Sequence, residues 1–325
     1  MRLLTNTHIQ FIKLRYYAYI LSLLILIPGL IAIFVKGMNW SVDFTSGVAL
    51  EVNLSPSDES LPPLQIDDLR KVLEDNGFED AEIQNIGDVS ASHFLIKGKG
   101  TAQGAGDKII QILVNNFPQY IKGQDLRKDV ILQVNEVGPK VGSELRKQAI
   151  WAVIVALILM IIYIWIRFEL TFGIAAIIAL FHDVLCIVGI FALTGKEITT
   201  EVIAALLTIV GYSINDTIVI YDRIREDLRI YRKDPYEVVF NNAINKTIGR
   251  TIVTGGSTLI VLLALYFFGG SVIHDFAFAM LLGLILGTYS SIFVASSLVV
   301  EYYHVTKKER SSLQALTSKS QPKRR

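Results

Sequence analysis

The sequence predicts a polytopic α-helical membrane protein with six transmembrane helices and one external α+β domain between the first two. Apolar runs of spanning length recur along the 325 residues, and about 20 apolar residues suffice to cross the hydrocarbon core as a helix. The segment 36–145 instead alternates polar and apolar residues between turn residues, which is typical of a mixed α/β domain. Charged residues make up 19% of the chain, below the roughly 25% of soluble domains.

The predicted transmembrane helices share an apolar composition and a length near that of one membrane crossing. They comprise 16–35, 146–166, 171–193, 201–221, 251–269 and 275–300. Backbone groups find no water in hydrocarbon, so each run has to be helical. The run 16–35 follows basic residues, as in a signal peptide. It is longer than an apolar signal core of about 7–15 residues, and no small-residue cleavage pattern follows it. We therefore expect it to remain as the first helix.

The distribution of Lys and Arg predicts the orientation in the membrane. Basic residues are concentrated in the N-terminal tail 1–15, the loop 222–250 and the C-terminal tail 301–325. The segment 194–200 carries only Lys196, and the turn 269–274 carries none. Because loops rich in Lys and Arg stay in the cytoplasm, both termini and the loop 222–250 are expected there, with 36–145 on the external, periplasmic side.

The remaining composition argues against other functional classes. The net charge of +1 gives no indication of a nucleic-acid partner, and none is expected. The lone Cys186 lies in an apolar run, so we expect a small packing residue rather than half of a disulfide. No nucleophile with an adjacent base and no metal-ligand spacing occurs in the external segment. We therefore expect neither an enzyme nor a bound metal or cofactor.

Strand and helix patterns follow one another in the external segment in the order βαββαβ. The predicted elements are strand 47–54, helix 66–75, strands 81–86 and 93–97 around a turn at 87–92, helix 108–117 and strand 130–137. This order is that of a ferredoxin-like fold. The domain is either a spacer that positions the first helix or a surface that contacts a partner or a passing substrate.

Polar side chains in the fourth run recur at helical spacing. At about 100° per residue, five of them fall within an arc of about 100°: Glu201, Thr208, Tyr212, Asn215 and Asp216. A charged side chain at the middle of a membrane helix costs about 2.5–3.5 kcal/mol and is functional by default. We expect this stripe to face other helices or water, with Asp216 a turn or two from the cytoplasmic end of its span. The structural alternative for Asp216 is a hydrogen bond between helices.

The fifth run opens on the cytoplasmic side with a second polar arc, formed by Thr247, Arg250, Thr251, Thr254 and Thr258. Because the two runs are antiparallel, Arg250 is expected near the depth of Asp216. A carboxylate beside Arg stays ionised and can take up a proton once the pair separates, which is the minimal element of a proton relay. The alternative for Arg250 is an ordinary anchor at the cytoplasmic surface.

Further polar groups could support such a relay. His182 and Asp183 lie near the middle of the third run, where they could relay protons or simply hydrogen-bond a neighbouring helix. Both alternatives remain open. The other candidate supporting groups are Asn215, Tyr212, Thr208 and Thr254.

Small residues predict where helices approach closely. The sixth run repeats them every four residues, at Gly283, Gly287, Ser291 and Ala295. Gly256 in the fifth run and Gly211 in the fourth are likewise small residues that we expect at helix contacts. Such faces allow close contact between helix backbones. The contact can lie within this chain or against the other half of a larger bundle.

Several motifs together resemble the SecF family of bacterial protein-export subunits. The main one spans 211–226 and reads GYSINDTIVIYDRIRE. The others are Glu136-Val137-Gly138-Pro139 with Val141-Gly142, Ala179-x-x-His182-Asp183, Arg250-Thr251 with Thr254-x-Gly256-x-Thr258, and Phe268-Gly269-Gly270. The resemblance extends from Val42 to about Tyr302. One departure is Ser46, which stands where the family usually has the first Gly of an Asp-Phe-x-Gly-Gly motif. Since Gly serves where a backbone needs positive φ, the turn geometry there is open.

The resemblance implies a transporter subunit of the resistance–nodulation–division class. It implies partnership with SecD as a separate chain, with the SecYEG channel and with a translocating preprotein, and it raises YajC and YidC as further partners. It also implies a place in the bacterial cytoplasmic (inner) membrane. The proton motive force would be the energy source, with Asp216 and Arg250 as the residues of proton passage, and Na⁺ instead of H⁺ stays open. The alternatives are a scaffold for SecD and the channel, or a small-molecule exporter, whose external domains would be far larger.

Overall fold

The computed structural model describes residues 7–56, 61–86, 92–99, 104–121 and 125–306, and these are predominantly helical. Six helical segments among them are long and apolar enough to cross a membrane: Ile12–Val35, Pro139–Arg167, Leu170–Thr194, Thr200–Ile230, Tyr236–Phe268 and Ile273–Thr306. The prediction of a multi-pass helical membrane protein is confirmed at this level.

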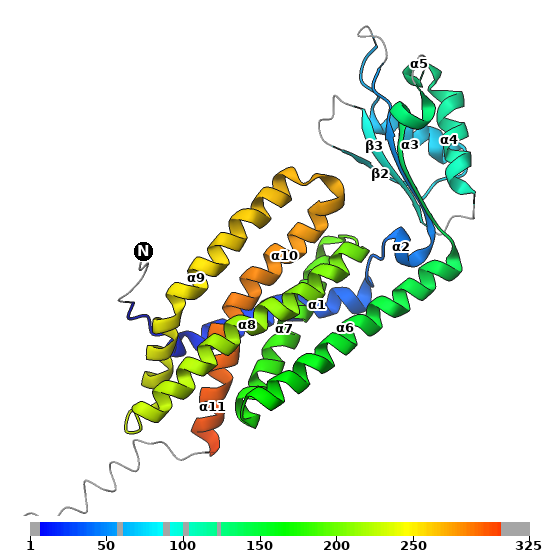
Figure 1. Ribbon diagram of the computed structural model, residues 1–325. Coiled ribbons are helices and arrows are strands. Elements are labelled where there is room, and N and C mark those ends of the chain that lie inside the picture. Colours follow the sequence, from blue (N-terminus) through cyan, green and yellow to red (C-terminus); the bar gives the residue numbers. More distant parts are fainter. Residues whose placement is uncertain (1–6, 57–60, 87–91, 100–103, 122–124, 307–325) are drawn as a thin grey trace, which may run out of the picture.

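The helices form one elongated bundle with an α/β domain at one end (Figure 1). They are α1 (Arg15–Val35), preceded by the short η1 (Ile12–Leu14), then α6 (Pro139–Arg167), α7 (Leu170–Thr194), α8 (Thr200–Ile230), α9 (Tyr236–Phe268), α10 (Gly270–Ser290) and α11 (Ser296–Thr306). A π-helical turn, η4 (Ser291–Ala295), joins α10 to α11. The last three elements therefore make one continuous helical segment.

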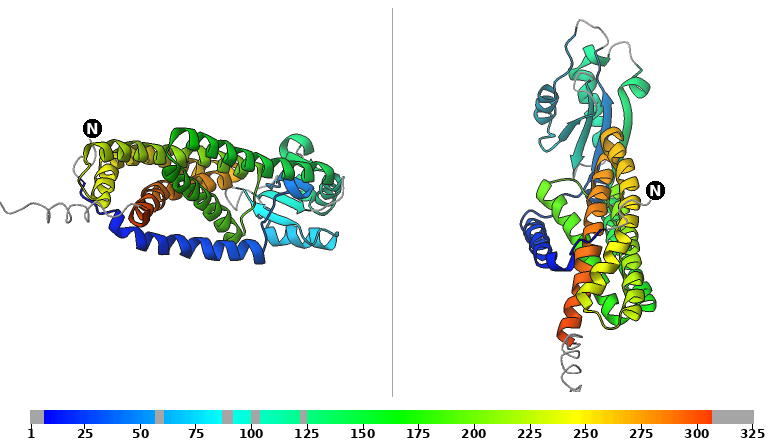
Figure 2. Two further views of the ribbon diagram at one scale, coloured as in Figure 1. Left: turned by 90° about the horizontal axis from the view of Figure 1, so that it is seen from below. Right: turned by 90° about the vertical axis from the view of Figure 1, so that its left-hand side faces the viewer.

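Helices α7, α8 and α10 occupy the centre of the bundle, while α1, α6 and α9 lie outside (Figures 1 and 2). The buried share of the most apolar stretch is 61% in α7 but 11% in both α6 and α9. Apolar surface that is not covered within the chain has to meet lipid or another protein. The outer faces of α6 and α9 are therefore the surfaces left for such contacts.

The α/β domain, residues 40–138, is built on an antiparallel sheet in the order β2-β3-β1-β4. The strands are β1 (Gly47–Asn53), β2 (Glu82–Asn85), β3 (His93–Lys99) and β4 (Ile131–Val137). Helices α3 (Ile66–Asp75) and α4 (Ala105–Asn116) cover one face, with the short α2 (Val42–Thr45), α5 (Pro118–Ile121) and η3 (Leu126–Val130) at the connections. The predicted turn at 87–92 lies outside the described residues except for Ser92.

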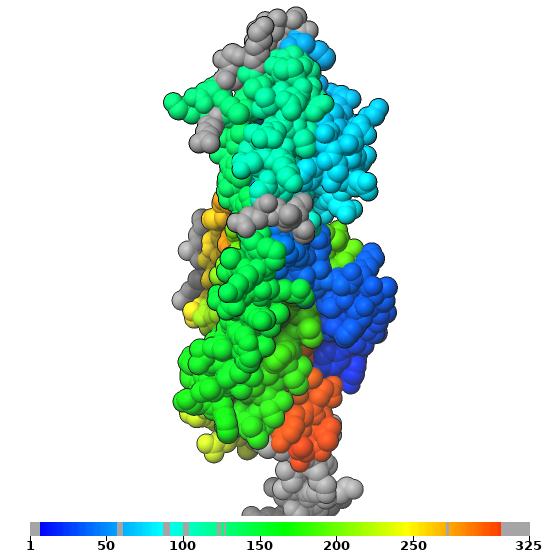
Figure 3. Space-filling view, turned by 90° about the vertical axis from the view of Figure 1, so that its right-hand side faces the viewer, coloured from blue at the N-terminus to red at the C-terminus, as the bar shows by residue number. Residues whose placement is uncertain are grey.

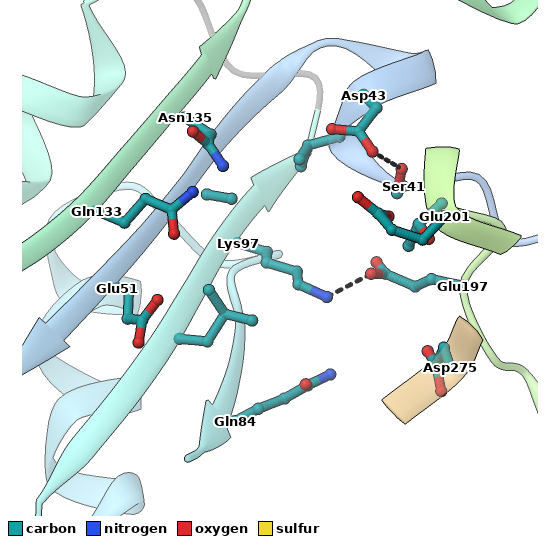
Figure 4. A pocket seen from close by; sticks show the side chains of 14 residues that line it. Ser41, Asp43, Glu51, Gln84, Lys97, Gln133, Asn135, Glu197, Glu201 and Asp275 are labelled. Carbon is teal, nitrogen blue, oxygen red and sulfur yellow. Dashed lines mark hydrogen bonds and ion pairs between the residues drawn. The ribbon is translucent and has the colours of Figure 1, made fainter. Parts of the chain in front are cut away.

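Alternation along the strands divides the sheet into two faces. Val48, Leu50 and Val52 of β1 are fully buried and join the helices in an apolar core. The opposite face turns toward the helix bundle and carries mainly polar side chains, among them Glu51, Lys97 and Asn135, beside Ala49 and Leu95 (Figure 4). Figure 3 shows how the domain continues the long axis of the bundle above α6 and α1. One face of the sheet thus serves the fold, and the other is available for polar contacts.

The segment 222–250, expected as a basic loop, is mostly helical. Helix α8 continues to Ile230 and α9 begins at Tyr236, so that only 231–235 connects them. The reason is an amphipathic pattern within the basic sequence: Ile224 of α8 and Phe240 of α9 are fully buried in one apolar cluster. Apolar residues at helical spacing keep both helices folded beyond the apolar spans.

Candidate functional site

Asp216 and Arg250 lie at matching heights on adjacent antiparallel helices. Asp216 is 14 residues before the end of α8 at Ile230, and Arg250 is 14 residues after the start of α9 at Tyr236. At about 1.5 Å per residue, both lie about 21 Å from the connection. The Asp216 side chain is buried, accepts no hydrogen bond from the described residues, and lies within electrostatic reach of the Arg250 charge. With α8 extended to Ile230, Asp216 falls in the middle of its helix rather than near its end.

Three other residues of the predicted polar stripe face outward from the chain. Glu201, Thr208 and Asn215 are exposed, and Thr208 Oγ1 donates to its own helix at Ala204 O (2.8 Å). The Tyr212 hydroxyl is buried without a hydrogen-bond partner in the described part of the chain. Thr254 of α9 is half-buried. Polar groups on an outer face of a membrane helix are costly in lipid, so this face is suited to contact with protein or water.

Asp183 forms the centre of a separate buried hydrogen-bond network. Its side chain is fully buried, and its Oδ2 accepts from Ser213 Oγ of α8 (2.6 Å) and from Ser290 Oγ of α10 (2.7 Å). Its Oδ1 lies 3.0 Å from His182 Nδ1. A fully buried carboxylate requires such partners, because an unpaired buried charge is strongly unfavourable. The network therefore ties α7 to α8 and α10.

The same network continues from His182 to α1. His182 Nε2 lies 2.9 Å from Ser22 Oγ, and Ser22 Oγ lies 3.1 Å from the Tyr289 hydroxyl. The Tyr289 hydroxyl donates to the carbonyl of Ala18 (2.5 Å). Cys186 Sγ lies 3.6 Å from His182 Nε2. Sequence spacing had left open what His182 and Asp183 contact; their partners belong to three other helices.

A second contact fixes the turn of α8 that carries Asp216. Thr217 Oγ1 lies 2.9 Å from Ser291 Oγ, the first residue of the π-helical turn η4. A Cβ built on Gly287 would lie 3.0 Å from Ser213 Cβ, so α8 and α10 approach closely at this level. Turns of π-helix inside α-helices frequently occur at functional sites. The backbone irregularity in the sixth span thus faces the residue next to Asp216.

The predicted packing glycines fall into two groups. A Cβ on Gly283 would lie 2.3 Å from side-chain atoms of Ile209, and Gly287 meets Ser213 as described. A Cβ on Gly211 or Gly256 would have no described atom within 4 Å. Close packing within the chain therefore involves Gly283 and Gly287, whereas the surfaces at Gly211 and Gly256 are open.

The polar face of the sheet and the α7–α8 connection enclose a cavity of about 190 Å³ (Figure 4). Glu197, which is 5% exposed, pairs there with Lys97 and with Lys99 Nζ (2.6 Å), both from β3. Burial alone would raise the pKa of Glu197, but the hydrogen bonds and charges of the two lysines outweigh it and place that pKa below its ordinary value. We call these three residues the latch.

Backbone contacts reinforce the latch. Trp40 and Ile198 form a parallel β-bridge, with Ser41 N donating to Ile198 O (3.1 Å) and Ile198 N donating to Asn39 O (2.7 Å). Asp43 Oδ2 accepts from Thr200 Oγ1 (3.3 Å) at the start of α8. The α/β domain is therefore attached to the bundle through the segment that opens α8.

Sequence reasoning missed the latch and the partners of Asp183. Lys97 and Glu197 lie 100 residues apart, and periodicity within one element carries no information on such pairs. Ser22 and Ser290 are small hydroxyl residues in apolar runs, which gave no signal on their own. Ser213 could have been found from the sequence, because it lies one helical turn before Asp216 and therefore near the same face of the helix. Within the described residues, no group of three or more His, Cys, Asp or Glu side chains is placed to hold a metal ion.

The fold and these sites define a class: a multi-pass membrane protein with ionisable side chains held between its helices. Residues 119–305 match the family described as protein export membrane protein SecD/SecF, C-terminal, and residues 31–58 match the SecD/SecF GG motif. The chain is 42% identical over 299 residues to protein translocase subunit SecF of Desulfurispirillum indicum, covering 90% of this chain and 91% of that protein. It belongs to the SecF family.

Two solved structures are similar to this chain. The crystal structure of SecDF, a translocon-associated membrane protein from Thermus thermophilus, matches this chain with a TM-score of 0.79 and 38% sequence identity. A crystal structure of SecDF in a super-membrane-facing form matches it with a TM-score of 0.67 and 37% sequence identity. They cover 93% and 97% of this chain. This chain covers only 40% and 41% of the length of those two chains, both of which are named SecDF.

Proposed function

We propose that this chain is the SecF subunit of the bacterial Sec export machinery and that, with SecD, it uses the proton motive force to promote preprotein translocation through SecYEG. Asp216 is the residue that takes up and releases the proton, and Arg250 is its counter-charge. The observation that carries this proposal is the placement of a buried carboxylate and an arginine at one height in the bundle, between α8 and α9. Ionisable groups in that position are expected on ion pathways.

The proposal includes a fold and an orientation. The α/β domain is ferredoxin-like, an assignment supported by the strand order β2-β3-β1-β4 and by a helix after β1 and another after β3. It lies on the periplasmic side, and both termini and the α8–α9 connection are cytoplasmic. The concentration of Lys and Arg beside that connection supports this orientation in the inner membrane.

SecD is proposed to pack on the outer face of α8 and α9. The exposed polar residues Glu201, Thr208 and Asn215, and the open surfaces at Gly211 and Gly256, support a protein rather than lipid at this face. The SecDF proteins, which join both names in one chain, support the pairing. Contacts with YajC, YidC and the preprotein are part of the proposal and follow from family membership alone.

The energy available fits a switch between two conformations. One charge moving through 100 mV yields about 2.3 kcal/mol, and 1.4 kcal/mol changes an equilibrium tenfold. One proton per cycle can therefore shift a two-state equilibrium by about fifty-fold. Neutralising Asp216 removes its attraction to Arg250, which frees α9 to move relative to α8, and the α/β domain follows through the start of α8.

The test is gradient-dependent export in membrane vesicles that contain SecD and SecYEG. We expect Asp216→Asn to abolish the stimulation by a proton gradient, because Asn keeps the size of Asp but cannot bind and release a proton. Asp222→Asn is the matched control on the same helix: Asp222 forms a partly exposed ion pair with Arg167 (2.6 Å), and such pairs contribute little. Replacing the proton gradient with a sodium gradient in wild-type vesicles identifies the ion.

Two outcomes decide the proposal. Loss of stimulation in Asp216→Asn, with normal assembly with SecD and normal behaviour of Asp222→Asn, supports Asp216 as the coupling residue. Retained stimulation in the assembled Asp216→Asn complex contradicts the coupling role and leaves this chain as a scaffold for SecD and the channel.

A further inference from the structure

The His182–Asp183 pair is a deeply buried ionisable site in the bundle, and the proposed coupling does not use it. Asp183 is 0% exposed and His182 7%. The titratable groups nearest the pair are Cys186, on the same helix, and Tyr289, on α10. Helices α1 and α8, which pack against the pair, each contribute a serine hydroxyl to it: Ser22 from α1 and Ser213 from α8.

The direction of each hydrogen bond in the network can be assigned by starting at the Ala18 carbonyl of α1, where the network ends. The carbonyl of Ala18 can only accept, so the single hydroxyl proton of Tyr289 goes to it (2.5 Å). The Tyr289 oxygen then accepts from Ser22, which uses the one proton of that serine. Ser22 Oγ is therefore an acceptor toward His182, and His182 Nε2 carries a proton.

This assignment fixes the contact between the two ionisable side chains. Nδ1 of His182 lies 3.0 Å from Asp183 Oδ1. A neutral histidine protonated at Nε2 has a bare lone pair on Nδ1, which an ionised carboxylate would repel. The contact is favourable only with a proton between the two atoms, either on Nδ1 or on Oδ1. In both cases the pair has no net charge.

The other carboxylate oxygen is assigned by the same argument. Ser213 Oγ and Ser290 Oγ lie 2.6 and 2.7 Å from Oδ2, and an oxygen that carries no proton accepts from both. Every polar atom of the pair is then satisfied. The network is fully buried at Asp183 and partly buried at its other end, where Tyr289 donates to a backbone carbonyl. A network with all its hydrogen bonds made favours keeping its proton in place.

We infer that His182 and Asp183 retain one proton between them as a net-neutral pair, and that this pair positions the turn of α8 that carries Asp216 rather than relaying protons. This inference rests on the proposed function for its link to Asp216. Ser213 precedes Asp216 by one helical turn, so its bond to Asp183 fixes that turn against α7 and α10. Asp183 is thus a positioning residue.

The inference makes an unusual prediction for Asp183→Asn. The amide oxygen of Asn can accept from Ser213 and Ser290, and its NH₂ group can donate to Nδ1 of a neutral His182. The substitution therefore keeps the shape, the hydrogen bonds and the net charge of the pair, and it leaves one amide N–H without a partner. We expect gradient-stimulated export within about twofold of wild type, an unchanged pH midpoint and a Tm closer to that of wild type than to that of Asp183→Ala.

Asp183→Ala and Ser213→Ala remove the bonds instead. We expect each to lower Tm by several degrees, because buried polar groups lose their partners. In assembled complexes we also expect Ser213→Ala to shift the pH midpoint of stimulated export, since it frees the Asp216 turn without removing an ionisable group. A change that only loosened the fold would leave this midpoint unmoved.

The result that overturns the inference is loss of stimulation in an assembled Asp183→Asn complex, the result expected for Asp216→Asn, because a proton relay needs the carboxylic acid itself. Loss of assembly in Asp183→Asn would overturn it too, because the inference holds that Asn keeps the contacts of the pair. A wild-type pH midpoint in Ser213→Ala would also overturn the positioning role. Failure of the proposed function is recognised separately, by retained stimulation in Asp216→Asn. In that case the Tm values still test the net-neutral pair, since they need no transport.

Discussion

Ser46 has a backbone conformation that residues with a side chain rarely adopt. Its φ is 78° and its ψ is 157°, and it lies between α2 and β1. This region of φ and ψ is essentially restricted to glycine and costs about 1–3 kcal/mol for other residues. Gly142 of α6 packs against the same turn, since a Cβ there would lie 3.0 Å from Ser46 N. In this chain Ser46 is therefore accommodated as backbone strain.

We predict that Ser46→Gly stabilises the protein by about 1 kcal/mol, because Gly adopts this conformation without strain. The measurement is thermal unfolding of the purified protein in detergent. Ser143→Gly is the matched control, since Ser143 lies in the first turns of α6 and Gly in a helix costs about 1 kcal/mol relative to better helix formers. Equal Tm changes of the same sign in the two variants would contradict the strain at Ser46.

Residue types and spacing could predict that Asp216 and Arg250 lie at a similar depth, because Asp216 is a charge in an apolar run and Arg250 directly precedes the next run on the same side. The same reasoning could not predict Ser22, Ser290 or the lysines of the latch. Their importance comes from partners on other elements, and helical periodicity reports which residues share a face but not what that face contacts. The hydrogen-bond directions that constrain His182 and Asp183 likewise require the positions of atoms from three other helices.

Helices α1 and α7 run parallel and meet at two levels seven residues apart. Ser22 faces His182 at one level, and Gly29 faces Gly189 at the other, so the same spacing occurs on both helices. A Cβ on Gly189 would lie 2.8 Å from the Gly29 Cα, which is closer than ordinary contact. Glycine at both positions lets the backbones approach, and this approach brings Ser22 within reach of His182.

We predict that Gly189→Ala destabilises the protein by about 1–3 kcal/mol, because the added methyl group separates α1 from α7. The Tm in detergent measures the effect. Gly256→Ala is the control within another membrane helix: its Cβ would meet no described atom within 4 Å, so no loss is expected. A tolerated Gly189→Ala would show that the two helices do not depend on this contact.

The extents of elements were predictable only in part. Hydropathy identifies the apolar part of each helix, and all six spans were found this way. It does not show where a helix ends, since α8 and α9 continue on amphipathic sequence and α6 begins at Pro139, a favoured first helical residue. The π-helical turn at Ser291 has no signal in the sequence, because it depends on how the sixth span packs on α8.

At the scale of the whole molecule, the α/β domain and the coupling residues share one element. The latch and the Trp40–Ile198 bridge attach the domain to the segment 195–200, and α8 begins there and carries Asp216 at its middle. A rigid helix transmits displacement along its length, so a shift of α8 at Asp216 moves the attachment point of the domain. The latch is therefore the place where this coupling can be weakened without altering the site of proton uptake.

The pH dependence of the latch follows from Glu197. Since the lysines place its pKa below the ordinary value of about 4.3, ionised Glu197 stabilises the folded protein above that ordinary value. This contribution is lost as the pH falls through the lower folded-state pKa.

We predict that Glu197→Gln costs about 1–3 kcal/mol at neutral pH and that the Tm difference from wild type disappears at strongly acidic pH. Glu82→Gln is the control, because Glu82 pairs with the same Lys99 (3.2 Å) but is half-exposed, and its effect should be small at every pH. A Tm difference for Glu197→Gln that persists or grows on acidification would show that Glu197 contributes through packing and not through its charge.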